Sequence, residues 1–439
     1  THLSAIFLPP GVAPAEHAAA RGVFRIGRAG KKNPYAERRE GMMTNMIYAD
    51  HAATTQVKPE VLEAMMPWFC EQYGNPSSLY AFAYPPKKAI AAAREEVARL
   101  LNAEPNEIYF TGCGTEADNW AIKGTALALQ GKGKHIITSK IEHHAVLHSC
   151  QYLEKKGFEV TYLDVDQYGM VSPDDLRAAI RDDTILISIM FANNEIGTIQ
   201  PIEQLGAIAR EHKIFFHTDA VQAAGHIPID VKAMNIDMLA LSGHKFGAPK
   251  GVGVMYMRRG VNIDPLIHGG GHERGKRSGT ENVPYIVGLG VAARIAREQM
   301  AEAMPRVAAL RDRLLEGALK LPYTIMTGHP TARHPGIASI CVEGIEGESL
   351  LLNMYNEGVC ASSGSACSSG SLDPSHVLLA IGLPHHIAHG SLRMSLGEEN
   401  TEEDVDRILA ALTRVVEKLR AMSPVWENGR PMWHAKEGE

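Results

Sequence analysis

The 439-residue chain lacks the features that would point to a membrane, a disulfide framework or a nucleic-acid partner. No apolar run approaches the roughly 20 residues needed to span a bilayer. The six cysteines are scattered and form no Cys-x-x-Cys pair, which favours a reducing compartment. The formal net charge is only −6, so no strong field favours nucleic acid as the main partner. We therefore expect a soluble, cytoplasmic protein that binds neither membranes nor nucleic acid.

Internal repeats are also missing, and low-complexity sequence is limited to a Ser/Gly cluster at residues 362–371. With 45% hydrophobic and 21% charged residues, the composition is that of a globular protein. A chain of this length exceeds one ordinary core, so two domains are expected.

The first 45 residues differ in character from the rest of the chain. They carry several Arg and Lys residues, scattered Gly and Pro, and no sustained periodicity. This predicts a disordered or added extension, with a natural start at Met43 or Met46; an arginine-rich organelle leader is the alternative. Three glutamates in the segment favour the extension.

From residue 47 to about residue 290, short apolar runs alternate with amphipathic stretches. The expected strands lie at residues 107–111, 135–138, 158–163, 184–191, 214–217, 236–240 and 251–257. The expected helices lie at residues 57–73, 86–101, about 115–130, 145–156, 173–181 and 201–211. This alternation predicts an α/β domain with a mostly parallel sheet covered by helices on both faces.

After about residue 290 the pattern changes to that of a smaller α+β domain. We expect a long helical stretch at residues 287–321, interrupted near Pro305. The other expected elements are strands at residues 337–342 and 391–396 and helices at residues 348–357 and 401–422. The predicted division is an extension (1–45), a large domain (46–303) whose first residues pack with the small domain, and a small C-terminal domain (304–439), with a hinge near residues 303–306.

Lys245 lies in Leu-Ser-Gly-His-Lys-Phe-Gly, residues 241–247, between two apolar runs. A lysine that forms a Schiff base must be held against an aldehyde in a dry site, which calls for a tight turn with polar neighbours. A lysine that only solvates a surface needs neither. Taken alone, the segment leaves both interpretations open.

Asp219 follows the predicted strand that ends at His217. A carboxylate in a partly buried cleft stays ionised only if it is paired, and a protonated pyridine nitrogen would be such a partner. Asp219 and Lys245 together supply the two groups that a pyridoxal phosphate site requires. A helix N-cap at Asp219 is the alternative, but it does not explain the lysine.

Other polar residues follow the remaining strands, at the edge where open parallel sheets bind ligands. The small residues before Thr115 suit a phosphate at a helix start, although Thr115 as an ordinary N-cap is equally consistent. His143 and His144 point in different directions on a helix, so they fit ring stacking better than metal binding. Asn194 could bind a carboxylate or a ring oxygen, or simply close a loop.

Two later segments also carry chemistry. Residues 268–282 are Gly-rich and basic and bear hydroxyls, which suits phosphate, but they match neither a P-loop nor a dinucleotide fingerprint. Cys367 lies in a run of small polar residues that cannot build a core. We expect an exposed thiol there, a candidate nucleophile, with structural indifference as the alternative. Cys360 abuts an apolar segment and is expected to be a packed thiol.

Seven short segments, read in order, resemble the NifS/IscS class of cysteine desulfurases: residues 48–55, 74–78, 112–118, 193–197, 242–245, 277–280 and 363–371. The resemblance covers about residues 47–426. The sequence His-Thr-Asp-Ala-Val-Gln at residues 217–222, Cys113 and residues 419–426 favour the NifS branch.

The resemblance implies a homodimeric fold-type I enzyme dependent on pyridoxal 5′-phosphate, bound by the large domain. Lys245 resembles the Schiff-base lysine, and Asp219 the partner of the pyridine nitrogen. His143 matches the ring-stacking histidine, which also transfers protons, and Gln222 matches the partner of the phenolic oxygen. The phosphate ligands implied are Gly114, Thr115, Ser242, His244 and, from the other subunit, Thr280.

The implied activity is removal of sulfur from L-cysteine, giving L-alanine and a persulfide on Cys367. Asn194 and Arg393 match the residues that hold the substrate carboxylate. The sulfur would serve iron–sulfur cluster assembly, including that of nitrogenase, through a scaffold protein of the NifU/IscU type. No resident metal is expected, although Cys367 could transiently ligate a cluster on a partner.

Three other classes of protein are the alternatives. A selenocysteine lyase would act on selenocysteine and barely on cysteine. An aminotransferase or other fold-type I enzyme would not need Cys367. A non-catalytic scaffold is disfavoured because Lys245, Asp219 and Cys367 are all present.

Overall fold

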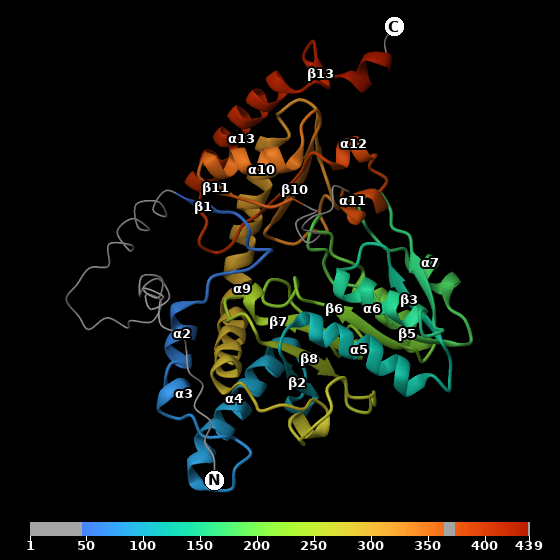
Figure 1. Cartoon of the computed structure of the whole chain (residues 1–439), viewed down its shortest axis with the longest axis vertical. Coiled ribbons are helices and arrows are strands. Elements are labelled where there is room, and N and C mark those ends of the chain that lie inside the picture. The colour runs from blue at the N-terminus through green and yellow to red at the C-terminus, as the bar shows by residue number, and fades with distance from the viewer. Residues whose placement is uncertain (1–45, 364–373, 438–439) are drawn as a thin grey trace, which may run out of the picture. The chain divides into compact units, whose positions relative to one another are not determined.

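The computed structural model describes residues 46–363 and 374–437. The predicted N-terminal extension and Cys367 lie outside these residues. All described helices and strands belong to the unit Ile47–Glu439 (Figure 1).

A seven-stranded sheet forms the centre of the larger part of this unit (Figure 1). Its strands, in spatial order, are β2 (Ile108–Thr111), β8 (Gly253–Met257), β7 (Met238–Ser242), β6 (Phe215–Asp219), β5 (Thr184–Ser188), β3 (His135–Ser139) and β4 (Glu159–Leu163). β8 runs antiparallel to both of its neighbours, while the pairs from β7 to β4 are parallel. The predicted mostly parallel sheet of the fold-type I class is confirmed.

Helices cover both faces of this sheet because successive strand residues point to opposite sides. Ile136 packs into the core formed with α5 and α6, whereas its neighbour Ile137 packs into the core formed with α4, α8 and α9. The helices of this part are α2 (Pro59–Met65), α3 (Pro67–Cys70), α4 (Tyr84–Leu101), α5 (Gly114–Leu129), α6 (His144–Glu154), α7 (Pro173–Ala179), α8 (Ile202–Glu211) and α9 (Val283–Ala318).

A second core forms around the antiparallel sheet β12-β10-β9. Its strands are β9 (Thr324–Met326), β10 (Ile337–Val342) and β12 (Ser391–Ser395), and its helices are α10 (Gly347–Asn356) and α13 (Glu402–Met422). Shorter elements are α11 (His376–Ala380), α12 (His385–Ala388), β13 (Trp426–Glu427) and β14 (Arg430–Pro431). Near the start of the unit, β1 (Ile47–Tyr48) pairs in parallel with β11 (Val359–Cys360) and contributes Ile47 to this core. The division into domains near residues 303–306 stays a prediction.

The predicted interruption of a helix near Pro305 is wrong. α9 continues through Pro305 from Val283 to Ala318. Proline inside a helix removes a hydrogen bond and costs about 3 kcal/mol or more. The first half of α9 packs into the core beside the large sheet and its second half into the second core, so burial on both sides of Pro305 offsets that cost.

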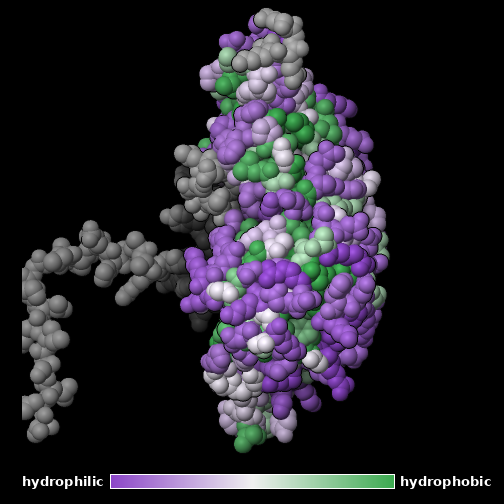
Figure 2. Space-filling view, turned by 90° about the vertical axis from the view of Figure 1, so that its right-hand side faces the viewer, coloured by the Kyte–Doolittle hydropathy of each residue, from purple (hydrophilic) through white to green (hydrophobic). Residues whose placement is uncertain are grey.

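Figure 2 shows one face of the molecule, on which hydrophilic and hydrophobic residues are interspersed. In residues 46–363 and 374–437, no helix combines the length and the apolar character needed to cross a bilayer.

Candidate active site

A cavity of about 390 Å³ lies where several parallel strands of the large sheet end. β6 ends at Asp219 and β7 at Ser242, and both of these residues line it. This is the edge of an open sheet at which ligands are expected. Ten of the twelve predicted site residues line the cavity: Gly114, Thr115, His143, Asn194, Asp219, Gln222, Ser242, His244, Lys245 and Arg393.

The other two predicted residues do not line it. Thr280 is exposed, and its assignment to the site of a second subunit stays a prediction. Cys367 lies outside the described residues, but Ser362, five residues earlier, lines the cavity. Among the residues that the structure describes, no group of three His, Cys, Asp or Glu side chains is placed to hold a metal ion.

Lys245 ends a single 3-10 turn, Gly243–Lys245, that directly follows β7. Its Nζ donates hydrogen bonds to the carbonyl oxygens of Ala52, at 2.6 Å, and Ala53, at 2.9 Å. These hydrogen bonds hold the amine of the half-buried side chain inside the cavity. A Schiff-base lysine needs this kind of placement.

Asp219 is buried at the end of β6, and its Oδ1 accepts a hydrogen bond from the backbone N–H of Val221 at 2.9 Å. Burial raises the pKa of this carboxyl, and the imidazole of His143, the backbone N–H of Val221 and the charge of Lys245 offset part of the rise. A cationic group in the cavity would favour its ionised form. A protonated pyridine nitrogen therefore fits the site.

His143 is the N-cap of α6, and its Nδ1 accepts a hydrogen bond from the backbone N–H of Ala145 at 3.1 Å. Burial lowers the pKa of the ring, against the opposing effect of Asp219. A neutral imidazole with its proton on Nε2 follows from these contacts. Such a ring can stack on a planar cofactor and exchange a proton at Nε2.

The start of α5 forms a cradle for an anion. The first N–H groups of a helix have no partner within it and attract negative charge. Gly114 opens the helix, and a Cβ there would lie 2.5 Å from Cγ2 of Val221, so only glycine fits without movement. Thr115 lines the cavity beside Gly114. The close approach and the helix start together suit a phosphate.

His244 and Gln222 complete the contacts around the lysine. His244 Nδ1 lies 3.1 Å from Thr54 Oγ1. Burial, and then the charge of Lys245, lower the pKa of His244 to about 4, so this ring is neutral at pH 7. The Nε2 of Gln222 donates to the carbonyl oxygen of Ala52 at 2.9 Å.

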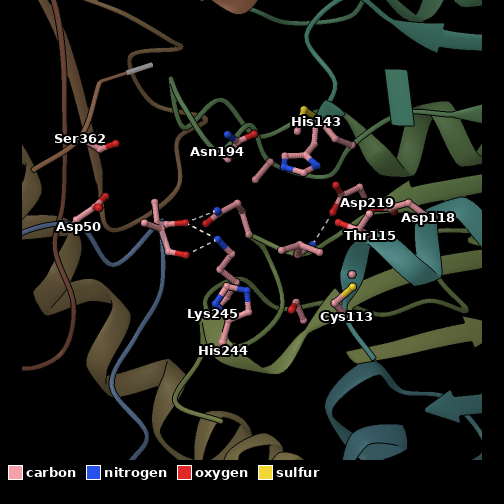
Figure 3. Close-up of a pocket in the computed structure, with 18 of the residues that line it drawn as sticks. Asp50, Cys113, Thr115, Asp118, His143, Asn194, Asp219, His244, Lys245 and Ser362 are labelled. Atoms are coloured by element: carbon pink, nitrogen blue, oxygen red, sulfur yellow. Dashed lines mark hydrogen bonds between the residues drawn. The ribbon is translucent and has the colours of Figure 1, made fainter. Parts of the chain in front are cut away.

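The cavity has two chemically different ends. Figure 3 shows Asp50 and Ser362 at one end, Asp118 and Asp219 at the other, and Lys245 between them. Arg393, on β12, belongs with Asp50, because its Nη2 lies 2.9 Å from Asp50 Oδ1. A planar guanidinium in this position can hold a carboxylate.

The sequence did not identify two acidic residues of this cavity as site residues. Asp50 belongs to residues 48–55, one of the segments that carry the family resemblance, and has no predicted role in the site. Asp118 is buried one turn after Thr115 on α5, and burial, followed by the charge of Asp219, raises its pKa well above the ordinary value. Its Oδ1 lies 3.5 Å from the buried Nε2 of His217. The three-residue spacing from Thr115 could have indicated Asp118, because such residues share a helix face.

Known proteins match this sequence and this fold. The sequence model of the aminotransferase class-V family matches residues 47–408. The chain is 62% identical to "Cysteine desulfurase IscS" of Methanosarcina thermophila over 379 residues, which are 86% of this chain and 94% of the relative. It is 57% identical to a protein of the same name from Clostridium botulinum over 389 residues, 88% of this chain and 98% of the relative.

Solved structures agree with these relatives. A "NIFS-LIKE PROTEIN" superposes with a TM-score of 0.81 at 41% identity, covering 85% of this chain and 100% of that one. "SspA in complex with cysteine" gives a TM-score of 0.72 at 41% identity, covering 81% of this chain and 99% of that one. The chain therefore belongs to the aminotransferase class-V family, as a pyridoxal 5′-phosphate-dependent cysteine desulfurase of the NifS/IscS type. The assignment to the NifS branch stays a prediction.

Proposed function

We propose that this enzyme removes the sulfur atom of L-cysteine, releases L-alanine and holds the sulfur as a persulfide on Cys367, from which it passes to iron–sulfur cluster assembly. The observation that carries the proposal is one cavity that joins Lys245 and Asp219 to a buried arginine, Arg393. The first two residues suit the cofactor, and the arginine suits the carboxylate of an amino acid.

The residues toward Asp219 would hold pyridoxal 5′-phosphate. Asp219 would face the pyridine nitrogen, Gln222 the phenolic oxygen and the start of α5 the phosphate, with Ser242 and His244 as further phosphate ligands. When bound, this cofactor supplies an aldehyde for amines and a ring that withdraws electrons from the α-carbon of the substrate.

Side chains of the protein bind the substrate and transfer its protons. Arg393 and Asn194 bind the substrate carboxylate and orient the amino acid. Lys245 takes the α-proton, and the neutral ring of His143 relays protons at Nε2. The carbonyl oxygens of Ala52 and Ala53 hold the lysine amine in reach of the cavity.

Cys367 acts as the nucleophile. Its thiolate attacks the sulfur of L-cysteine, forming a sulfur–sulfur bond as the carbon–sulfur bond breaks. The electron pair of the broken bond stays with carbon, which takes up a proton and leaves as L-alanine. Ser362 lines the substrate end of the cavity, which supports delivery of Cys367 from this side.

Exposed apolar side chains support a homodimer. They gather in the segment from α2 to the start of α4: Leu62, Met66, Phe69, Tyr73, Leu79, Tyr80 and Phe82. An exposed apolar patch of this kind indicates a protein–protein interface. Thr280, which is also exposed, would reach the phosphate in the second subunit. We further propose a cytoplasmic enzyme with a NifU/IscU-type scaffold as sulfur acceptor.

The test is to incubate the purified holoenzyme with L-cysteine and a reductant and to measure L-alanine and sulfide. We expect both products from the native enzyme. Cys367→Ala should abolish sulfide release while the cofactor absorbance persists, and Cys70→Ala, which changes an exposed thiol, should change neither. Sulfide from the Cys367 variant would contradict its role as nucleophile. Cleavage of L-selenocysteine but not of L-cysteine would instead favour a selenocysteine lyase.

A further inference from the structure

A carboxylate already contacts the arginine that is proposed to hold the substrate. Asp50 Oδ1 lies 2.9 Å from Nη2 of Arg393, and both residues line the cavity. The side chains retain only 20% and 6% of their exposure, so water screens this ion pair weakly. The proposed mechanism assigns no role to Asp50.

Backbone pairing places Asp50 beside β12, the strand that carries Arg393. Asp50 forms a parallel bridge with Ser395 of β12, two residues beyond Arg393. Arg393 in turn exchanges backbone hydrogen bonds with Ser362, at 2.7 and 3.0 Å. Backbone pairing with β12 therefore sets the separation of Asp50 and Arg393.

The guanidinium is held in one orientation by two contacts. Nη1 donates to the carbonyl oxygen of Asn194 at 2.8 Å, and Nη2 meets Asp50. The buried Nε has no hydrogen-bond partner within the described residues. Losing the Asp50 contact would leave the carbonyl of Asn194 as the remaining described side-chain anchor of Arg393.

We propose that Asp50 is a positioning and specificity-determining residue of the substrate end: it orients Arg393 toward a single substrate carboxylate and disfavours amino acids with an acidic side chain. The inference rests on the proposed function, because it takes Arg393 as the carboxylate-binding residue. A neutral side chain, such as that of L-cysteine, adds no charge beside Asp50. A second carboxylate in the substrate would lie near the negative charge of Asp50 and be repelled.

Two substitutions of Asp50 separate its effect on the orientation of Arg393 from the effect of its negative charge. Asp50→Asn keeps an oxygen that can accept from Nη2 but removes the negative charge, whereas Asp50→Ala removes both. Asp406→Asn is the matched control, because Asp406, on α13, forms an ion pair with Arg313 of α9, and neither residue lines the cavity. Steady-state kinetics with L-cysteine give KM and kcat for each holoenzyme. Equilibrium titrations of the cofactor absorbance with L-alanine and L-aspartate, which differ by one carboxylate, give the selectivity.

We expect Asp50→Ala to raise KM about tenfold while kcat changes less than about threefold, since a binding contact is lost. Asp50→Asn should keep KM within about threefold of the native value and raise the affinity for L-aspartate relative to L-alanine about tenfold.

An unchanged KM in the alanine variant, or an unchanged affinity ratio in the asparagine variant, would overturn the proposal. If Asp50→Ala fails to fold, the affinity ratio of Asp50→Asn decides. Native enzyme that forms no L-alanine would refute the proposed function, while the two titrations would still decide the role of Asp50.

Discussion

At the scale of single residues, buried carboxyls beside the cavity make stability depend on pH. Glu142 is fully buried, and its Oε1 accepts hydrogen bonds from Ser139 Oγ at 2.6 Å and the backbone N–H of Met190 at 2.9 Å. Burial raises its pKa to about 8. The folded protein therefore keeps a proton that the unfolded chain releases above its ordinary value of about 4.5. This contribution is complete below that value and is lost as the pH rises toward 8.

Glu142→Gln should flatten this dependence, because the amide oxygen can accept the same two hydrogen bonds without titrating. Between the pKa of the unfolded chain and that of the folded protein, one bound proton changes the free energy of unfolding by about 1.4 kcal/mol per pH unit. The free energy of unfolding, measured with urea from about pH 5 to about pH 8, should fall less in the variant than in the native protein. Glu95→Gln, at an exposed position of α4, is the control. Equal slopes in the native protein and the Glu142 variant would contradict this.

Site residues that lie directly after predicted strands could be identified from the sequence. Lys245, Asp219 and His143 each follow a predicted strand, so the ends of a parallel sheet bring them to one edge. Asp50 was not identified, because it reaches the cavity by pairing with Ser395, 345 positions later in the sequence. Such pairing leaves no local pattern.

At the scale of elements, α4 and α9 pack with almost no space between their backbones. A Cβ on Gly290 of α9 would lie 2.5 Å from Cα of Ala93 on α4. Gly290→Ala should push the helices apart and lower the free energy of unfolding by about 1–3 kcal/mol, the usual cost of overpacking. Gly131→Ala is the control, because its Cβ would meet no atom within 4 Å. Denaturant unfolding measures the free energy of unfolding of both variants. A Gly290→Ala variant as stable as the native protein would contradict the close packing.

Two properties of the elements could not be read from local sequence. Proline usually breaks a helix because it lacks a backbone N–H, so Pro305 predicts an interruption. Packing of α9 on both sides of Pro305 stabilises one continuous helix instead. The reversed direction of β8 depends on how its ends connect to the neighbouring strands, and an apolar strand reads the same in either direction.

At the scale of the whole molecule, the proposed homodimer depends on the apolar patch from α2 to α4. Leu79 is 99% exposed and Met66 is 57% exposed, so charges there disturb no core of the single subunit. Leu79→Asp combined with Met66→Glu should convert the dimer to a monomer, because a buried unpaired charge is costly. Sedimentation gives the mass of each form. Leu319→Asp, an exposed leucine after α9, should leave the dimer intact. A native monomer, or a patch variant that still dimerises, would contradict the interface.

The order of elements along the chain was sufficient to predict an α/β part followed by an α+β part. It did not show that α9 supplies side chains to two apolar cores, from Val283 in one to Ala318 in the other. Neither core can melt without leaving half of this helix unsupported. The two are thus tied into a single cooperative unit, so that the protein should lose its structure in one thermal transition, with α9 among the last segments to exchange its amide hydrogens.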